Sequence, residues 1–370
     1  MNTGGALSVY HLTRFVTLLQ DLFGWNLARA KCGAAILLGL IKVRTVNLTE
    51  LATAVPGDAK VDSKYKRLQR FFKEVPLNFN LVAKLIAGLV PQDQFSLTLD
   101  RTIWQLGKLS INILYLAIVY QGIAIPILWS YLPKKGNSNT GERIALIDRF
   151  IAIFGVEKIV CLLADREFCG QEWINYLIEK RIKFRIRIKV NTHINRQQGG
   201  TAPVKNFFRS LPINGAMQLK SQRQVWGHKL YVTGMRLVSG EYLIIIHSDP
   251  NTAVIVMEDY AKRWEIETLF KCLKSGGFNF EDTHLIDPER LEKLVAFLAI
   301  AFSWAYIMGE WCHTQKPIRV KSHQRPAKSI FRYGLDWLRD ILLNIIDKVD
   351  AYNDAVVLFL NRLGWSNILT

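Results

Sequence analysis

The sequence predicts an α/β fold in which a mixed sheet lies between helical regions at the two ends of the chain. Apolar residues recur at helical intervals over residues 1–90 and over most of residues 281–370. Between these regions, hairpin-like apolar runs are followed by alternating helical and strand-like segments, which is typical of a sheet with strands of both directions. Half of the 370 residues are hydrophobic, so the chain can bury a sizeable core.

The N-terminal region, residues 1–90, is interpreted as a helical nucleic-acid-binding region. Its segment Ser63–Lys73 (SKYKRLQRFFK) interleaves basic residues with aromatic ones, so that cations can meet phosphates while the rings pack inward. A solvated face of an amphipathic helix would show the same pattern, and both interpretations stay open. The candidate phosphate contacts here are Lys64, Lys66, Arg67 and Arg70.

The central region, residues 91–190 and 241–280, carries the predicted sheet. Its strands are rich in Ile, Val, Leu, Tyr and Trp and are separated by short turns or by helices. The predicted strands are Phe95–Trp104, Ile111–Tyr120, Ile123–Tyr131, Lys158–Ala164, Lys183–Val190 and Tyr242–His247. The predicted helices cover about residues 143–154, 171–180 and 252–274.

An acid-free segment interrupts this region. Residues 180–240 contain 13 Lys and Arg and no Asp or Glu, and residues 190–240 have the alternating pattern of short strands, which predicts a small basic β-rich insertion. The whole chain has a formal net charge of +17, which favours a polyanionic partner, either nucleic acid or an anionic membrane surface.

The C-terminal region, residues 281–370, is predicted to be helical and is a candidate for oligomerisation. Its longest apolar run, Leu294–Gly309, is shorter than the roughly 20 residues that cross a bilayer, so we interpret it as a buried core helix. A second basic, acid-free stretch follows at residues 316–332. Five cysteines without a CxxC pair, and a start without the pattern of a secretory signal, predict a cytoplasmic protein with no structural zinc.

Three acids stand out by their positions. Asp100 and Asp165 each lie at the margin of an apolar strand, where a carboxylate is costly unless it is paired or binds a metal. Either could instead be a strand-terminating or capping residue. Glu267 shares a helical stripe about 60° wide with Tyr260, Arg263 and Lys274, and Lys271 lies close to the stripe. Such a stripe is either a salt-bridged surface or a cation site flanked by phosphate contacts.

The spacing of this stripe, Y-x2-R-x3-E-x6-K, resembles the signature of bacterial DDE transposases of the insertion-sequence-four family. The resemblance includes Asp100 at the end of SLTLD and Asp165 in DREF, and it spans almost the whole chain, although the two ends match only in character. It implies a ribonuclease H-like catalytic domain in which Asp100, Asp165 and Glu267 form the acidic triad.

By the same resemblance, the triad would hold two Mg²⁺ ions about 3.5 to 4 Å apart, with Mn²⁺ able to substitute. The implied reaction is cleavage at transposon ends, followed by in-line attack of the freed 3′-hydroxyl on target DNA, with or without a hairpin step. Tyr260, Arg263 and Lys274 would contact terminal phosphates, and Trp226 is a candidate to hold a flipped base, unless it is a core residue of the insertion.

The resemblance also implies the partners. These are duplex transposon-end DNA with inverted repeats, target DNA and a second copy of the chain in a homodimer, in the bacterial cytoplasm with the nucleoid and with no role for a membrane. Two alternatives remain open from the sequence. One is a ribonuclease H-like nuclease or resolvase that hydrolyses DNA without strand transfer, and the other is an inactive DNA-binding descendant.

Overall fold

The computed structural model describes the backbone of residues 3–322 and 324–364, with side chains from Thr13 onward. The chain forms two compact units. The first, the helical unit, consists of residues 1–91, 104–111 and 269–370. The second, the sheet unit, consists of residues 92–103 and 112–268. The boundary between the two units after Thr268 falls within the helix that spans Glu265–Leu273.

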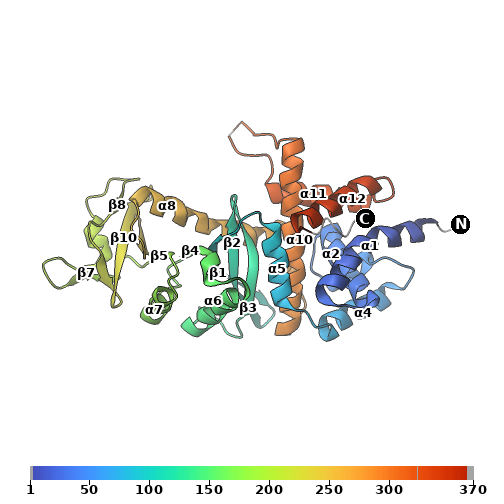
Figure 1. Cartoon of the computed structure of the whole chain (residues 1–370), viewed down its shortest axis with the longest axis horizontal. Helices are drawn as coiled ribbons and strands as arrows, with labels where there is room; N and C mark the ends of the chain where they lie inside the picture. Colours follow the sequence, from blue (N-terminus) through green and yellow to red (C-terminus); the bar gives the residue numbers. More distant parts are fainter. Residues whose placement is uncertain (1–2, 323, 365–370) are drawn as a thin grey trace. The chain divides into compact units, whose positions relative to one another are not determined.

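The helical unit is built around the apolar helix α10. Figure 1 shows α10 as the longest helix of this unit, and it packs against α2, α4, α5, α11 and α12. Helices α10 and α11 approach closely, because a Cβ added at Gly334 would stand 1.9 Å from the carbonyl oxygen of Ala305. The helices of the unit are α1 (Thr3–Phe23), α2 (Leu27–Val43), α3 (Leu48–Ala54), α4 (Val61–Glu74), α5 (Phe79–Leu89), α10 (Pro288–Gln315), α11 (Ile330–Leu343) and α12 (Val349–Arg362).

The predicted core helix is confirmed. Helix α10 contains the run Leu294–Gly309, and it is the one unbroken helix of the described chain that is long and apolar enough to cross a membrane. Its apolar window is 94% buried inside the protein, as expected for a core helix.

The sheet unit carries most of one mixed sheet. Its strands follow the order β3-β2-β1-β4-β5-β11-β10-β8, and β9 pairs with β10. The strands are β1 (Phe95–Leu106), β2 (Leu109–Tyr120), β3 (Ile123–Tyr131), β4 (Ile159–Ala164), β5 (Phe184–Arg187), β8 (Ala216–Gln218), β9 (Arg223–Val225), β10 (His228–Arg236) and β11 (Tyr242–His247). A separate pair is formed by β6 (His193–Asn195) and β7 (Thr201–Pro203).

Strand directions within the sheet are mixed, as predicted. Strand β4 pairs in parallel with β1 and with β5, whereas β2 with β3, β5 with β11 and β11 with β10 are antiparallel. The parallel connections are made by helices α6 (Thr140–Phe154) and α7 (Gln171–Glu179), which join β3 to β4 and β4 to β5 along the chain. The mixed α/β fold with helices at both ends is therefore confirmed.

Two predicted elements differ from the structure. The helix predicted over residues 252–274 is interrupted, because α8 (Ala253–Ala261) passes through a 3-10 turn (Lys262–Trp264) before α9 (Glu265–Leu273) begins. The strand predicted to reach Val190 ends at Arg187, where the pairing of β5 with β11 stops. A stripe drawn on a straight helix is thus only an approximation of how these side chains are placed.

Candidate active site

The register of the sheet brings the two predicted strand acids together. Leu99 in β1 pairs with Ala164 in β4, and the strands are parallel, so Asp100 and Asp165 follow at the same step of adjacent strands. Leu97 and Leu99 are fully buried, which anchors β1 in the core and leaves the partly exposed carboxylate of Asp100 beside β4. The carboxyl ends of parallel strands are where ligand sites gather in α/β sheets.

The residues from the predicted stripe reach the same two acids. The guanidinium of Arg263 donates to Asp100 Oδ2 at 3.2 Å and to Glu267 Oε1 at 2.8 Å. The hydroxyl of Tyr260 donates to Asp165 Oδ1 at 3.4 Å. The side chain of Arg263 is only 5% exposed, whereas that of Glu267 is 60% exposed, so Arg263 lies inside the site and Glu267 at its open side.

The site holds more negative charge than its nearest cations offset. The pKa of Asp100 is raised to about 6, mainly by burial, with smaller contributions in the same direction from the carboxylates of Glu167 and Asp165, while the Arg101 N–H and Arg263 lower it. Burial likewise raises the pKa of the Tyr260 hydroxyl, so this side chain stays a neutral donor. A buried carboxylate that resists ionisation marks a position where an added cation would be favourable.

Sequence reasoning missed two cations of this site. Arg187, the last residue of β5, places Nη1 3.8 Å from Asp165 Oδ1. Arg101 donates to Glu167 Oε1 at 2.8 Å and to Asn137 Oδ1 at 2.7 Å. The sequence contained an indication of Arg187. Arg185 and Arg187 alternate with apolar residues, so their side chains lie on one face of the sheet and need polar partners there.

A buried arginine holds the loop that carries Asp165. Arg143 of α6 is 4% exposed and donates to the carbonyl oxygens of Glu167 at 3.0 Å and Cys169 at 3.3 Å. It also donates to the hydroxyl and the carbonyl of Ser138, and its guanidinium lies 5.2 Å from the ring centroid of Phe168. The loop after β4 is therefore fixed to the loop before α6.

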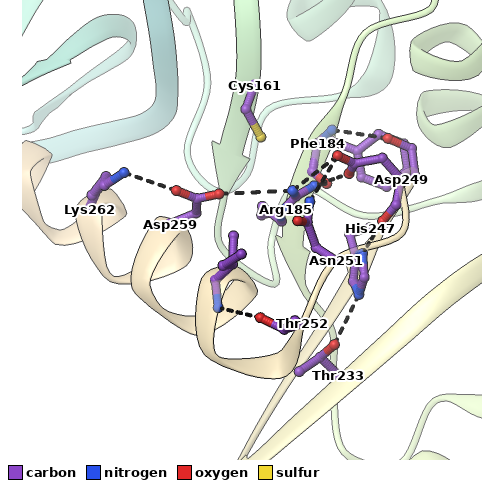
Figure 2. A network of polar contacts seen from close by, with 12 residues as sticks. Cys161, Phe184, Arg185, Thr233, His247, Asp249, Asn251, Thr252, Asp259 and Lys262 are labelled. Atoms are coloured by element: carbon purple, nitrogen blue, oxygen red, sulfur yellow. Dashed lines mark hydrogen bonds and ion pairs between the residues drawn. The ribbon is translucent and has the colours of Figure 1, made fainter. Parts of the chain in front are cut away.

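A second network fixes the helix that delivers Tyr260. Figure 2 shows Arg185 of β5 between two carboxylates, that of Asp249 after β11 and that of Asp259 on α8. Asp249 also accepts from Asn251 Nδ2 at 3.1 Å. Asp259 immediately precedes Tyr260, so this ion pair ties α8 to β5 next to the candidate site.

A neutral histidine completes this network. His247 is fully buried, with Nε2 2.9 Å from Thr233 Oγ1 and Nδ1 2.8 Å from the carbonyl oxygen of Asp249 (Figure 2). Burial lowers the pKa of His247 to about 4, so its ring is neutral near pH 7. We refer to Arg185, Asp249, Asp259 and His247 as the Arg185 network.

Two predicted phosphate contacts, Lys271 and Lys274, belong to the helical unit. Lys271 is exposed on α9. Lys274 lies one residue beyond the end of α9, with Nζ 2.8 Å from Glu281 Oε1 and 5.6 Å from the ring centroid of Trp104.

The cations predicted on the N-terminal helix differ in exposure. On α4, Lys66, Arg67 and Arg70 are exposed, while the aromatic residues Phe71 and Phe72 are buried, as an amphipathic helix requires. Lys64 is instead buried, at 9% exposure. Of the predicted cations of α4, Lys66, Arg67 and Arg70 thus point outward, and Lys64 contributes little to the charged face of the helix.

Trp226 lies at a strained turn. It connects β9 to β10 in a two-residue hairpin with Gly227, at φ angles of 49° and 83°. Both values belong to the left-handed region that such turns need and that Asn, Asp or Gly usually supply. The side chain is half-buried. A bulky residue at such a position costs conformational energy.

The carboxylates fit a hard divalent cation by their chemistry, because oxygen atoms are the ligands that Mg²⁺ prefers. Two of these carboxylates, those of Asp100 and Glu267, form ion pairs with Arg263. Over the described ranges, no three His, Cys, Asp or Glu side chains are grouped closely enough to hold a metal ion. Arg263 therefore occupies Asp100 Oδ2 and Glu267 Oε1, two of the oxygens that a metal held by the three acids could use.

The fold and the two acids define a class of α/β proteins with an acidic site where the pairing of two parallel strands stops. The sequence profile of the transposase DDE domain matches residues 96–304, which include Asp100, Asp165 and Glu267. The chain belongs to this family of transposases, which are nucleic-acid-processing enzymes.

Comparison with solved structures finds a piggyBac transposase synaptic complex with hairpin DNA, determined by cryo-EM. The similarity has a TM-score of 0.46 at 12% sequence identity and covers 94% of this chain and 77% of that chain. No curated protein matches the sequence.

Proposed function

We propose that this transposase cleaves DNA at transposon ends and joins the freed 3′-hydroxyl to target DNA, as a member of the insertion-sequence-four family with a ribonuclease H-like catalytic domain. The observation that supports this most is the convergence of Asp100, Asp165 and Glu267 with Arg263, because residues far apart in the sequence meet where the parallel pairing of β1 with β4 stops. All of them lie within the matched transposase domain.

In this proposal, Asp100, Asp165 and Glu267 hold a divalent cation, Mg²⁺ or Mn²⁺. When bound, the metal supplies an activated oxygen nucleophile and stabilises the leaving oxygen. The chain's own residues position the DNA. Arg187 and Tyr260 stand beside Asp165 and can donate to a phosphate, and Arg263 can transfer its donors from carboxylates to phosphate when DNA arrives.

Other residues are proposed to bind DNA away from the chemistry. Trp226 at its strained turn would hold a displaced base, and Lys66, Arg67 and Arg70 would contact phosphates.

We propose functional regions at 1–90 for DNA binding, 91–190 with 241–280 for catalysis, 190–240 for the basic insertion and 281–370 for oligomerisation. Lys271 and Lys274 would contact terminal phosphates. A homodimer in the bacterial cytoplasm, bound to two DNA ends, would place two active sites in one complex.

The test is cleavage and joining of radiolabelled DNA that carries the inverted repeat adjacent to the gene, with Mg²⁺ or Mn²⁺. Asp100→Asn, Asp165→Asn and Glu267→Gln should each lower cleavage by on the order of a thousandfold, because several kcal/mol of transition-state stabilisation depends on the metal. Exposed Glu179→Gln serves as the matched control and should keep full activity. Full cleavage by all three variants would reject the triad.

A second arm of this test separates strand transfer from hydrolysis. A pre-cleaved end with a free 3′-hydroxyl should be joined to a supercoiled plasmid by the wild-type protein. Cleavage without any joined product would instead indicate a hydrolytic nuclease, and the absence of both reactions together with tight end binding would indicate an inactive descendant.

A further inference from the structure

The connection between α10 and α11 is a basic segment that the catalytic proposal leaves unused. Residues 316–322 and 324–329 connect these helices and extend away from them in Figure 1. The sequence contains no Asp or Glu between Glu310 and Asp336. The basic residues of the connection are exposed, namely Lys316, Arg319, Lys321, Arg325 and Lys328.

Backbone hydrogen bonds shape this segment into a two-stranded ribbon. Ala327 N donates to Arg319 O at 2.8 Å, Lys321 N donates to Arg325 O at 2.9 Å, and Val320 and Pro326 form an antiparallel bridge. Residues 319–321 and 325–327 are therefore held by backbone pairing, although they are solvent-exposed. Their side chains are placed by this pairing.

The pairing puts three cations on one face of the ribbon. Residues directly opposite one another share a face, and so do residues two apart along a strand. Because Val320 faces Pro326, the next pair is Lys321 with Arg325, and Arg319 lies on that same face. Val320, which is 55% exposed, belongs to the other face.

These three cations are not balanced by the protein. At the base of the ribbon, Asp336 pairs with Lys328 at 3.5 Å and with Arg332 at 2.8 Å. Within the described part of the chain, no ion pair joins Arg319, Lys321 or Arg325 to an acid. Like charges that face one another across a strand pair destabilise it, so this face is more favourable with a polyanion against it.

We propose that the face formed by Arg319, Lys321 and Arg325, which we name the ribbon face, binds the sugar-phosphate backbone of duplex DNA. The major groove admits a two-stranded ribbon, and cations on one face of it can reach phosphates at the groove edge. The contact carries affinity rather than sequence preference, since phosphates are the same at every step. This proposal rests on the proposed function, in which the protein acts on duplex DNA.

The experiment measures the affinity of the full-length protein for a 40-base-pair duplex, without divalent metal, over a series of salt concentrations. Each phosphate contact contributes a slope of about 0.9 in log affinity against log salt. The triple variant Arg319→Gln/Lys321→Gln/Arg325→Gln should therefore reduce the slope by roughly 2 to 3. Arg319→Lys/Arg325→Lys keeps the charges and should keep the wild-type slope.

The matched control removes two exposed cations outside the regions proposed to bind DNA (1–90 and 190–240), with Lys108→Gln/Lys180→Gln, and should change the slope by much less. An unchanged slope in the ribbon variant overturns the inference, while wild-type binding to the duplex shows that the proposed function survives. A ribbon variant that keeps its slope but loses self-association would assign the face to a second copy of the chain. A wild-type protein that does not bind duplex DNA would reject both proposals.

Discussion

Strand β5 contributes to two arginine and carboxylate clusters that differ in how far their charges are satisfied. Arg185, two residues before Arg187, is 3% exposed and is held by Asp249 and Asp259. Arg187 is 22% exposed and touches the margin of a site where Asp100, Asp165, Glu167 and Glu267 gather. The Arg185 network is closed, whereas the candidate active site is open and has an excess of acid.

This difference indicates different roles for similar chemistry. In the Arg185 network, buried charges meet partners within the protein, which fixes α8 against β5. In the active site, burial raises the pKa of Asp100, and the lowering effects of the Arg101 N–H and Arg263 do not offset it. Proteins retain such unfavourable arrangements where binding or catalysis requires them, so stability and function should respond in opposite directions to mutation.

The largest effect is expected on breaking the closed cluster. Arg185→Met leaves Asp249 and Asp259 without their buried cation and should lower the free energy of unfolding by about 3 to 5 kcal/mol, measured by urea denaturation. Arg187→Met is the matched control on the same strand. It removes a longer and more exposed contact, 3.8 Å, and should cost less than about 1 kcal/mol. Equal losses in the two variants would contradict the comparison.

The next effect has the opposite sign. Asp100→Asn should raise the free energy of unfolding at pH 7.5 without metal by about 2 to 3 kcal/mol, because ionised Asp100 pays a burial cost that the amide avoids. The pKa of Asp100 is about 6 in the folded protein and about 3.9 when unfolded, so the wild-type protein loses stability as the pH rises between these values.

The pH dependence gives this prediction its control. Below about pH 3 the carboxyl group is protonated in both the folded and unfolded states, so the wild-type and Asp100→Asn proteins should have the same stability there. The difference between their free energies of unfolding should grow from about pH 3 to about pH 7 and then stay constant. A stability difference that does not change with pH would mean that packing, and not the charge of Asp100, is responsible.

Much of the fold could be predicted from the sequence because its apolar periodicities are strong. The three runs that became β1, β2 and β3, and the core helix α10, follow from local patterns of burial. The break between α8 and α9 could not be predicted, because Lys262–Trp264 contains no Gly or Pro and forms a 3-10 turn in its tertiary setting. Propensity alone does not record such a setting.

The candidate site was predictable where a fixed spacing or a strand end marked it, as for Asp100, Asp165 and Arg263. The Arg185 network was not, because Asp249 and Asp259 lie in a loop and on a helix where acids are ordinary. Their significance arises only when β5 and α8 meet in space. The salt bridge of Lys274 with Glu281 could not be predicted either. The predicted stripe assumed a helix that continues through Lys274, whereas α9 ends at Leu273.

The smallest expected effect concerns Arg263. This arginine pairs with two carboxylates of the active site, as Arg185 pairs with two carboxylates in the Arg185 network. Its guanidinium is bonded to Asp100 and Glu267, so under the proposed function it competes with a divalent cation for the same carboxylates. Two unit charges about 4 Å apart near a protein surface interact by up to about 4 kcal/mol. Part of this is lost to rearrangement, so Arg263→Gln should bind Mn²⁺ about tenfold more tightly without DNA, a gain of about 1.4 kcal/mol, measured by calorimetry.

The control for this prediction is Arg166→Gln, which removes an exposed cation next to Asp165 in the sequence and should leave Mn²⁺ affinity nearly unchanged. Asp100→Asn/Arg263→Gln should lose the gain, because the carboxylate that the variant frees is then absent. Affinity that falls in Arg263→Gln would show that Arg263 organises the acids for metal. Affinity that rises would show that the Arg263 guanidinium competes with the metal ion for the carboxylates. Under the proposed function, DNA phosphates would then draw Arg263 away so that all three acids can bind the cation.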